Sequence, residues 1–480
     1  MNPAAPEADP STGVFRENEL ASLFATLAHH PRVALAVSGG ADSVALMLLV
    51  RSWLDLKSRA FSSKMDVGLR RENATRQRDG AAFRFIRNGI GASGPQITVL
   101  TVDHRLREAA ASEAEWVKRK ALGLGFQHQT LVWEGEKPRS DLQAGARRAR
   151  YGLMTAYCRT ATIPAIATAH TSDDQAETFI MRLARGSGLD GLSAMQDISR
   201  WNGIDILRPL LMVSRRRIEA FLLQRDQPWL EDPSNDDERY ERVRIRRKLK
   251  AAQSLGLLPA RLALSARRLR RARDALDMVT AEFLRANVSL HQAGFATLHL
   301  PELCEIHEDI ALRALARMIA ALGGGTAPLR LSRIEAYYQM MRTAPRSATL
   351  GGCRLIVKGA DLTIMREIGR MDMMCGSMIQ PGESRLWDGR FMVTYAGGET
   401  GAATLRALGV DGVHAAKSAK GHFSVVPRLA AMTLPALWIE RKLCYAPFVD
   451  FTGKAPDGWS VGSHAEFSNA WPMPATSRGA

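Results

Sequence analysis

Short apolar runs alternate with helix-like segments along the first 210 or so residues of the chain. Runs of β-forming residues predict strands at residues 33–37, 96–102, 127–133 and 163–169. Helices are predicted between them, one capped by Ser112 with Glu115 completing a capping box, and another at residues 142–159. Strands that are apolar throughout are typical of a parallel sheet covered on both faces. The pattern therefore predicts an α/β fold with a doubly wound parallel sheet, in which ligands bind beyond the carboxyl ends of the strands.

The rest of the chain is predicted to be mostly helical and then mixed. Amphipathic periodicity predicts helices at residues 214–225, 261–287, 300–322 and 332–341, followed by a hairpin at residues 348–357. Residues 387–393 begin a smaller domain that contains strands, and the tail from His464 onward is expected to be disordered. Residues 57–94 delay the second strand beyond the short connections usual in α/β folds. We interpret them as a basic insertion with one helix near residues 80–87.

A glycine-containing hexapeptide, Ser38-Gly39-Gly40-Ala41-Asp42-Ser43, joins the first strand to the next helix. Two adjacent glycines permit positive φ angles and the close approach of a ligand, and the first N–H groups of the helix have no partner within it. Such a turn can hold a phosphate. The hexapeptide lacks the lysine of the Walker loop and the spacing of the dinucleotide-binding motif. The alternative is an ordinary tight turn between a strand and a helix.

Acidic residues follow the ends of two other predicted strands. Asp173, Asp174 and Glu177 open the helix after the fourth strand, and Asp103-His104 ends the second strand. On a helix, Asp173 and Glu177 share one face. Such a cluster can bind Mg²⁺ or an ammonium group, although acids at a helix start also serve the helix dipole. The alternative is that Asp103 only caps the end of the strand and that His104 is only a packed core residue.

The charge of the chain favours a polyanionic partner. Lys and Arg number 65 and Asp and Glu 49, which gives a net charge of +16 over 480 residues. Between Arg242 and Arg273 there are twelve basic residues and no acidic one. Arginine clusters of this kind bind nucleic acid, but they also pair with the acids of neighbouring domains.

Other features favour a cytoplasmic protein. The five cysteines are far apart and include no Cys-x-x-Cys pair, so a disulfide framework or a zinc cluster is not expected. The first residues lack the basic start and apolar run of a signal peptide. The longest apolar run, residues 44–50, is far shorter than the roughly 20 residues that span a bilayer.

Taken with their order, the motifs resemble one family. The hexapeptide is similar to the signature of the PP-loop ATP pyrophosphatases at every fixed position. From about residue 33 to residue 247 the chain resembles the bacterial tRNA(Ile)-lysidine synthases, through Val102-Asp103-His104, Ala146-Arg147-x-Ala149-Arg150-Tyr151, Asp173-Asp174-Gln175-Ala176-Glu177-Thr178, Arg208-Pro209-Leu210-Leu211 and Asp232-Pro233-Ser234-Asn235. Arg105, Thr171 and the 57–94 insertion depart from the family pattern.

The resemblance implies a fold, a reaction and its partners. The fold is an adenine-nucleotide α-hydrolase-like sheet, followed by a mostly helical middle domain and a small mixed C-terminal domain. The reaction activates the wobble cytidine of tRNA(Ile) with a CAU anticodon, using ATP and Mg²⁺, and then joins free L-lysine to the adenylated base. Pyrophosphate and AMP are released, and the product is lysidine. The oligomeric state stays open, with a homodimer as one candidate.

The same scheme gives each candidate residue a role. Residues 38–43 (Ser38, Gly39, Gly40, Ala41, Asp42 and Ser43), with Asp103 and His104, are expected to bind ATP. Asp42 and Asp174 are the candidates for holding Mg²⁺ and organising the transition state, and Asp173 and Glu177 for binding the lysine ammonium. Arg147 and Arg208 are candidates for neutralising phosphate. The candidates for tRNA binding are seven arginines: Arg244, Arg246, Arg247, Arg267, Arg268, Arg270 and Arg271.

The expected domains are a tail at 1–17, a catalytic domain at 18–212, a mainly helical tRNA-binding domain at 213–370, a small α/β domain at 375–463 and a tail at 464–480. Three alternatives stay open at this point. A sulfur-inserting PP-loop enzyme typically needs catalytic cysteines, and an amidotransferase needs a glutaminase domain with a catalytic cysteine near its start. A non-catalytic RNA-binding protein would explain the charge, but not the intact hexapeptide and the acids at 173–177.

Overall fold

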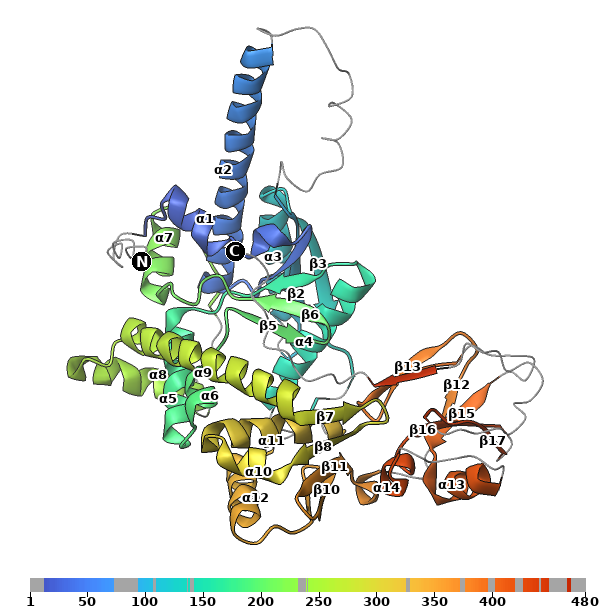
Figure 1. Ribbon diagram of the computed structural model, residues 1–480. Helices are drawn as coiled ribbons and strands as arrows, with labels where there is room; N and C mark the ends of the chain where they lie inside the picture. Colours follow the sequence, from blue (N-terminus) through green and yellow to red (C-terminus); the bar gives the residue numbers. More distant parts are fainter. Residues whose placement is uncertain are drawn as a thin grey trace. The chain divides into compact units, whose positions relative to one another are not determined.

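The chain folds as two compact units, residues 1–273 and 274–480 (Figure 1). The structure is a computed structural model, and it describes residues 13–72, 94–106, 109–135, 137–138, 142–231, 239, 241–324, 329–371, 376–395, 402–418, 426–439, 442–448 and 464–467. The helix expected near residues 80–87 and the Asp232–Asn235 stretch lie outside these residues. The further division of the chain at residues 212 and 370 stays a prediction.

A six-stranded sheet forms the centre of the first unit, with strand order β3-β2-β1-β4-β6-β5. Strands β3, β2, β1, β4 and β6 are parallel, which confirms the predicted parallel sheet. Strand β5 pairs antiparallel to β6 and forms an edge hairpin that was not predicted. The strands are β1 (Arg32–Ala36), β2 (Gln96–Asp103), β3 (Gln127–Val132), β4 (Ala165–Ala167), β5 (Ile198–Trp201) and β6 (Ile204–Leu207).

Alternate residues of β1 enter two separate cores, which gives the unit three layers. Val33 and Leu35 pack in one cluster with residues of α2 (Ala41–Glu72), α3 (Ala110–Gly123) and α7 (Arg215–Leu223). Ala34 packs on the other face against Tyr151 and Met154 of α4 (Leu142–Thr160). The short α1 (Glu17–Leu23) and η1 (Leu27–His29) join the first cluster. The sheet is therefore doubly wound, as the apolar strands predict.

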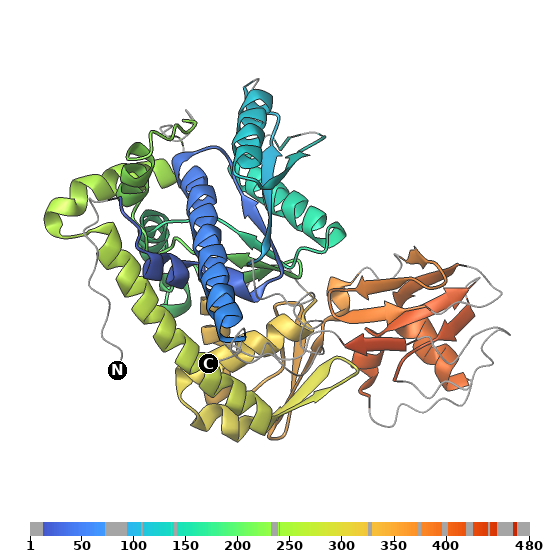
Figure 2. The same cartoon turned by 90° about the horizontal axis from the view of Figure 1, so that it is seen from above.

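Two local predictions are wrong in this unit. Helix α2 continues to Glu72, so the start of the 57–94 segment belongs to a long helix. The helix extends well beyond the strands in Figure 1, and Figure 2 shows it in blue from above. Ser112 does not cap α3, because the helix begins at Ala110 and the Ser112 hydroxyl donates to the carbonyl of Ala109. Ala109 already has helical dihedral angles, so Ser112 lies within the first turn of the helix and not at its start.

Four further helices pack beside the carboxyl end of the sheet. They are α5 (Ser172–Ala184), α6 (Leu189–Leu192), α8 (Glu241–Ala252) with η4 (Gln253–Leu255), and α9 (Pro259–Asn287). Ala176 and Phe179 of α5, Leu249 of α8, and Leu262 and Ala266 of α9 share one small apolar cluster. This cluster fixes α8 and the first half of α9 against α5. Ala272 and Val279, which helical periodicity puts on the core face of the predicted 261–287 helix, are exposed, so that prediction is wrong for these two residues.

The second unit begins with helices packed on a five-stranded antiparallel sheet of order β7-β8-β11-β10-β9. Its elements are β7 (Val288–His291), β8 (Phe295–His299), α10 (Leu300–Glu305), α11 (Glu308–Leu322), α12 (Leu331–Thr343), β9 (Ala348–Leu350), β10 (Cys353–Lys358), β11 (Asp361–Arg366) and η5 (Ile368–Arg370). The hairpin at 348–357 was predicted. The long-range pairing of β8 with β11 was not, because nothing local in either segment specifies it.

Two small antiparallel sheets, β12-β15-β16-β17 and β13-β14-β18, follow. Their elements are β12 (Ser377–Ile379), β13 (Ser384–Trp387), β14 (Phe391–Thr394), β15 (Ala403–Ala407), α13 (Gly409–Ser418), α14 (Arg428–Ala431), β16 (Pro435–Ile439), β17 (Lys442–Tyr445) and β18 (His464–Phe467). The expectation of disorder from His464 onward is wrong for β18, which pairs with β14. Among the helices that the structure describes, none combines the length and the apolar character that crossing a membrane requires.

Candidate active site

The glycine loop is closed tightly after β1. Gly39 has a φ of 91°, and a Cβ atom there would lie 2.6 Å from Cδ1 of Leu230. The amide of Leu230 also donates to the carbonyl of Gly39 at 2.9 Å. A side chain at position 39 would therefore be strained in conformation and would collide with this segment.

Hydroxyl groups hold the loop in shape. The buried Ser43 donates from its Oγ to the carbonyl of Gly40 at 2.9 Å, and it accepts from the amide of Ser38 at 3.2 Å. The two serine hydroxyl oxygens are 3.4 Å apart. Helix α2 begins at Ala41, and the amides of Ser43 and Val44 both donate to the carbonyl of Gly40 at 3.0 Å. The amides that precede Ser43 lie at the open start of the helix, where an anion can bind.

The structure brings the loop and the acids of α5 together around one arginine. Asp42 Oδ2 lies 3.3 Å from Nε and 3.2 Å from Nη2 of Arg215. Arg215 Nη2 is also 3.5 Å from Asp174 Oδ1, and the Arg215 backbone amide donates to Asp173 Oδ2 at 2.9 Å. Three carboxylates from two distant segments therefore meet at the start of α7.

Asp174 is held by its own helix start. Its Oδ2 accepts hydrogen bonds from the amide and hydroxyl of Thr171 at 2.8 and 3.0 Å, and the two residues form a capping box. Thr171 thus has a local structural use where it departs from the family pattern. Burial opposes ionisation of Asp174, but Arg242 and Arg215 outweigh it and hold the pKa of Asp174 below its usual range.

Asp42 has the opposite balance. Burial, together with the nearby charges of Asp174 and Asp173, outweighs the attraction of Arg215 and raises the pKa of Asp42 to about 6. Its Oδ1 atom is buried and has no hydrogen-bond partner within the described part of the chain. An additional cation near this oxygen would stabilise the ionised form.

Glu177 is buried between two arginines of α8. Its side chain is 2% exposed, and its oxygens lie 2.5 Å from Arg242 Nε and 2.7 Å from Arg246 Nε. Arg242 also donates to Asp174 Oδ1 at 2.7 Å. In this arrangement Glu177 is not open to a lysine ammonium, and Arg246 does not face outward toward RNA.

Asp103 and His104 lie at the same edge of the sheet, beyond β2. Asp103 Oδ1 accepts from the amide of Arg105 at 2.8 Å, and Arg105 adopts a φ of 49°. The His104 ring stands edge-on to Trp133, with centroids 5.7 Å apart, and burial lowers its pKa. Asp103 therefore shapes its own turn, and His104 and Trp133 form an aromatic corner that sequence reasoning missed.

The basic candidates of this domain have unequal surroundings. Arg208 is buried and donates to the carbonyl of Gln196 at 2.8 Å and to Ser199 Oγ at 3.0 Å, so it ties β6 to β5. Arg147 is exposed, with its guanidinium 5.1 Å from the centre of the Tyr151 ring. Arg147 is therefore the more accessible of the two to a phosphate.

The seven arginines predicted to bind tRNA also divide. Arg270 is buried and its Nη1 lies 3.0 Å from Asp197 Oδ2, while Arg246 contacts Glu177. The other five are exposed: Arg244 and Arg247 on α8, and Arg267, Arg268 and Arg271 on α9. All five lie at the surface of the described part of the chain, where a polyanion can reach them.

Arg215 is a further site residue that sequence reasoning missed. It is one of three consecutive arginines, of which Arg216 is exposed and Arg217 pairs with Glu19. Ser214 caps α7 by accepting from the amide of Arg217, which fixes the start of the helix. A cap followed by a basic residue after the Arg208–Leu211 motif was the available signal, but it does not say which arginine faces the acids.

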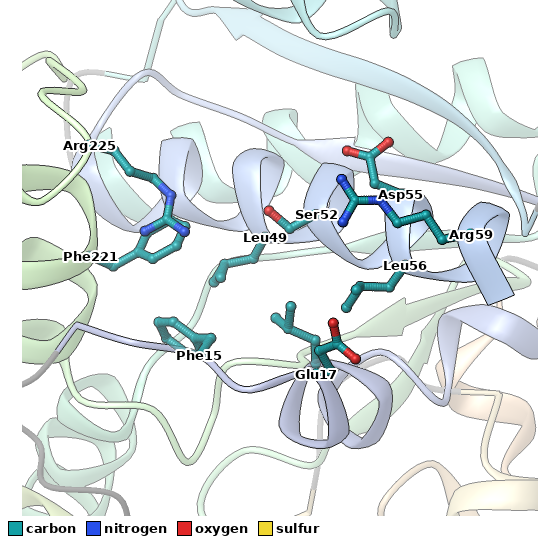
Figure 3. A pocket seen from close by; sticks show the side chains of 10 residues that line it. Phe15, Glu17, Leu49, Ser52, Asp55, Leu56, Arg59, Phe221 and Arg225 are labelled. Carbon is teal, nitrogen blue, oxygen red and sulfur yellow. The ribbon is translucent and has the colours of Figure 1, made fainter.

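A hollow of about 250 Å³ lies apart from this loop, between the N-terminal segment, α2 and α7 (Figure 3). Phe15, Leu49 and Phe221 give it apolar walls, and Glu17 and Arg59 are among its charged lining residues. Leu49 is eight residues after the start of α2, or about 12 Å along the helix at 1.5 Å per residue. The hollow is therefore not the nucleotide site. Among the described residues, no three or more His, Cys, Asp or Glu side chains form a metal-binding group.

Comparisons with known proteins support the assignment of the glycine loop to a PP-loop domain. Residues 14–253 match the family model of the PP-loop domain. The chain is 34% identical to the tRNA(Ile)-lysidine synthase of Ruegeria pomeroyi over 90% of both chains. It is 35% identical to that of Bradyrhizobium diazoefficiens over 78% of this chain and 95% of the relative, and 41% identical to that of Methylobacterium nodulans over 56% and 82%. The chain therefore belongs to the tRNA(Ile)-lysidine synthase family of PP-loop proteins.

Proposed function

We propose that the protein is a ligase that forms lysidine at the wobble cytidine of tRNA(Ile) with a CAU anticodon. ATP adenylates the base and pyrophosphate leaves; the amine of free L-lysine then attacks, and AMP leaves. Family membership supports the reaction, and the observation that carries it is the meeting of Asp42 with Asp173 and Asp174 around Arg215, beside the open helix start of α2.

The glycine loop is the proposed pyrophosphate site. Its backbone amides and the positive end of the α2 dipole attract an anion, and Gly39 lets the chain turn where a side chain would collide with Leu230. Negative charge grows on the pyrophosphate as its bond to the α-phosphate breaks. Donors already fixed in position stabilise that charge without reorganising.

Mg²⁺ suits the residues of this site. Carboxylate oxygens are the protein ligands that Mg²⁺ prefers, and it commonly takes one or two of them together with phosphate oxygens and water. Asp42 offers a buried oxygen that has no hydrogen-bond partner among the described residues. Asp174 lies across Arg215 from it, and its oxygens also contact Arg242 and Thr171. These two residues would hold the ion, which would supply positive charge to the phosphates when bound.

Asp173 is the better of the two proposed partners for the lysine ammonium. It is partly exposed, and its recorded contacts are donors to a single oxygen, Oδ2, from Arg215 and Ser172. Glu177 is already neutralised by two arginines. We therefore assign lysine binding to Asp173, and we assign to Glu177 the positioning of Arg242 and Arg246.

The tRNA backbone is proposed to follow the exposed arginines of α8 and α9. Phosphate contacts of this kind make affinity depend on salt, while the choice of base comes from other contacts. The cytoplasm is the proposed location of the reaction, and a homodimer stays a prediction.

A sulfur-transferring role is disfavoured by the one cysteine of the first unit. Cys158 is buried, and burial raises its pKa to about 12, so it stays a thiol at neutral pH and is a poor nucleophile.

The reaction is tested by AMP release from ATP in the presence of unmodified tRNA(Ile), with and without L-lysine. We expect AMP only when tRNA and lysine are both present, and lysidine in the recovered tRNA. Binding of the tRNA without AMP formation would instead identify an RNA-binding protein, and sulfur incorporation would identify a thiolase.

A further inference from the structure

Arg215 is the cation at the centre of the acidic cluster. Its guanidinium contacts Asp42 and Asp174, and its backbone amide contacts Asp173. The Ser214 cap places it in the first turn of α7, and Ile218 and Phe221 bury that helix against the core of the sheet. The position of the guanidinium is therefore set by the fold.

The remaining surroundings of Arg215 differ from those of a purely structural ion pair. Its side chain is 24% exposed, so solvent or a ligand reaches it. Within the described part of the chain, the recorded side-chain bonds involve Nε and Nη2. The fork of the guanidinium therefore keeps a donor, Nη1, that can serve an anion.

The negative charge around the glycine loop also favours a cation at the position of Arg215. Three carboxylates, those of Asp42, Asp173 and Asp174, lie around Arg215 beside the glycine loop. A bound triphosphate would add further negative charge there. The neighbouring arginines are occupied or face elsewhere: Arg217 pairs with Glu19, and Arg216 is exposed. A phosphate held by the loop that contains Asp42 lies within reach of the guanidinium that contacts Asp42.

We propose that Arg215 binds the terminal phosphates of ATP, and the pyrophosphate that leaves, while it keeps Asp42 and Asp174 in place before the nucleotide arrives. As the cytidine base forms its bond to the α-phosphorus, the bond from that phosphorus to the oxygen bridging to the β-phosphate breaks. The electron pair of the broken bond goes to the pyrophosphate, beside the positive charge of Arg215. The inference rests on the proposed function, because it takes ATP as the ligand.

The proposed phosphate contact of Arg215 is tested by isothermal titration calorimetry. The affinities for inorganic pyrophosphate, ATP and AMP are measured in buffer with Mg²⁺ and without tRNA or lysine. We expect Arg215→Met to bind pyrophosphate and ATP at least about 10-fold more weakly, since a charge-assisted contact is lost, and to bind AMP within about twofold of the original protein. Arg215→Lys should recover part of the loss, because it restores the charge without the fork. Arg216→Met, one residue along the same helix, is the matched control and should change nothing.

A residue that only supports the site would weaken AMP binding as much as ATP binding, and that outcome would overturn the proposal. So would unchanged binding of both ATP and pyrophosphate. If Arg215→Met does not fold, the same comparison of ATP with AMP is made with Arg215→Lys. Lysine-dependent AMP release by the unaltered protein is scored separately, so a failed reaction and a failed phosphate contact are distinguished.

Discussion

Helix α8 and the first half of α9 have similar arginine-rich sequences, but α8 directs two of its arginines to the acids of the site, while three of the four candidate arginines on α9 are exposed. On α8, Arg242 and Arg246 point inward and hold Asp174 and Glu177. On α9, Arg267, Arg268 and Arg271 are exposed. Both helices pack on α5 through the same small apolar cluster, so the difference comes from which helical face meets the acids. A cluster of arginines in the sequence therefore predicts a polyanionic partner only for those arginines that do not form ion pairs with acids inside the protein.

Removing an inward arginine should have the largest effect. In Arg242→Ala, the 2%-exposed Glu177 keeps one arginine and Asp174 loses its shortest ion pair. We expect turnover to fall about 100-fold and the free energy of unfolding to fall by about 2 kcal/mol. AMP release and urea unfolding measure the two effects.

Arg244→Ala is the control for that substitution, because Arg244 is exposed on the same helix. It should leave the free energy of unfolding within about 0.5 kcal/mol of the original. If both substitutions reduced stability and turnover equally, the inward and outward faces of α8 would not differ as the structure indicates.

Removing the outward arginines of α9 should affect RNA rather than stability. The triple substitution of Arg267, Arg268 and Arg271 by Gln should weaken tRNA binding by about 10-fold or more, and reduce the slope of log affinity against log salt by about 2. Turnover at saturating tRNA should stay unchanged. Filter binding across a salt series measures the slope, and an unchanged slope would move the RNA footprint elsewhere.

Arg270 sharpens the comparison, because it lies on α9 but is buried against Asp197. Arg270→Gln should lower the free energy of unfolding by about 1 kcal/mol, since Asp197 is largely exposed and the ion pair is screened. The salt slope of tRNA binding should not change. A loss of slope as large as one phosphate contact would place Arg270 with the outward group.

A smaller effect is expected from His170, whose pKa is lowered to about 3, mainly by burial and also by arginines that include Arg242. Between that value and the unfolded pKa of about 6.5, the unfolded chain binds the additional proton. Stability should therefore decrease as the pH falls from 7 to 5. The thermal midpoint of His170→Gln should depend less on pH over this range; an identical dependence would show that His170 does not titrate on unfolding.

Local patterns were sufficient to predict the sheet and the loop. Three of the four predicted strands are mainly apolar, and Gly39 and Gly40 follow the first of them, so strand, turn and helix could be placed without knowing their neighbours. The acids at 173–177 could be placed at the same edge, because the carboxyl ends of parallel strands share it. The antiparallel hairpin of β5 and β6 gave no comparable signal.

The use of each arginine was harder to predict, because it depends on contacts between distant segments. Arg215 meets Asp42, which is 173 residues earlier in the chain. Helical phase held part of the answer: Arg270 is four residues after Ala266 and Arg246 three before Leu249, so each lies beside a buried stripe. The helical phase of an arginine does not show whether the neighbouring helix or strand carries an acidic residue at the contact.

The most direct test of the account concerns Asp42, because the central claim is that the glycine loop and the acids of α5 act on one ATP. Pyrophosphate release and tRNA affinity are measured together for Asp42→Ala. We predict that adenylation falls by about 1,000-fold or more while the tRNA dissociation constant stays within about twofold. Loss of both together would show that Asp42 supports the fold, and adenylation at the original rate would contradict the claim.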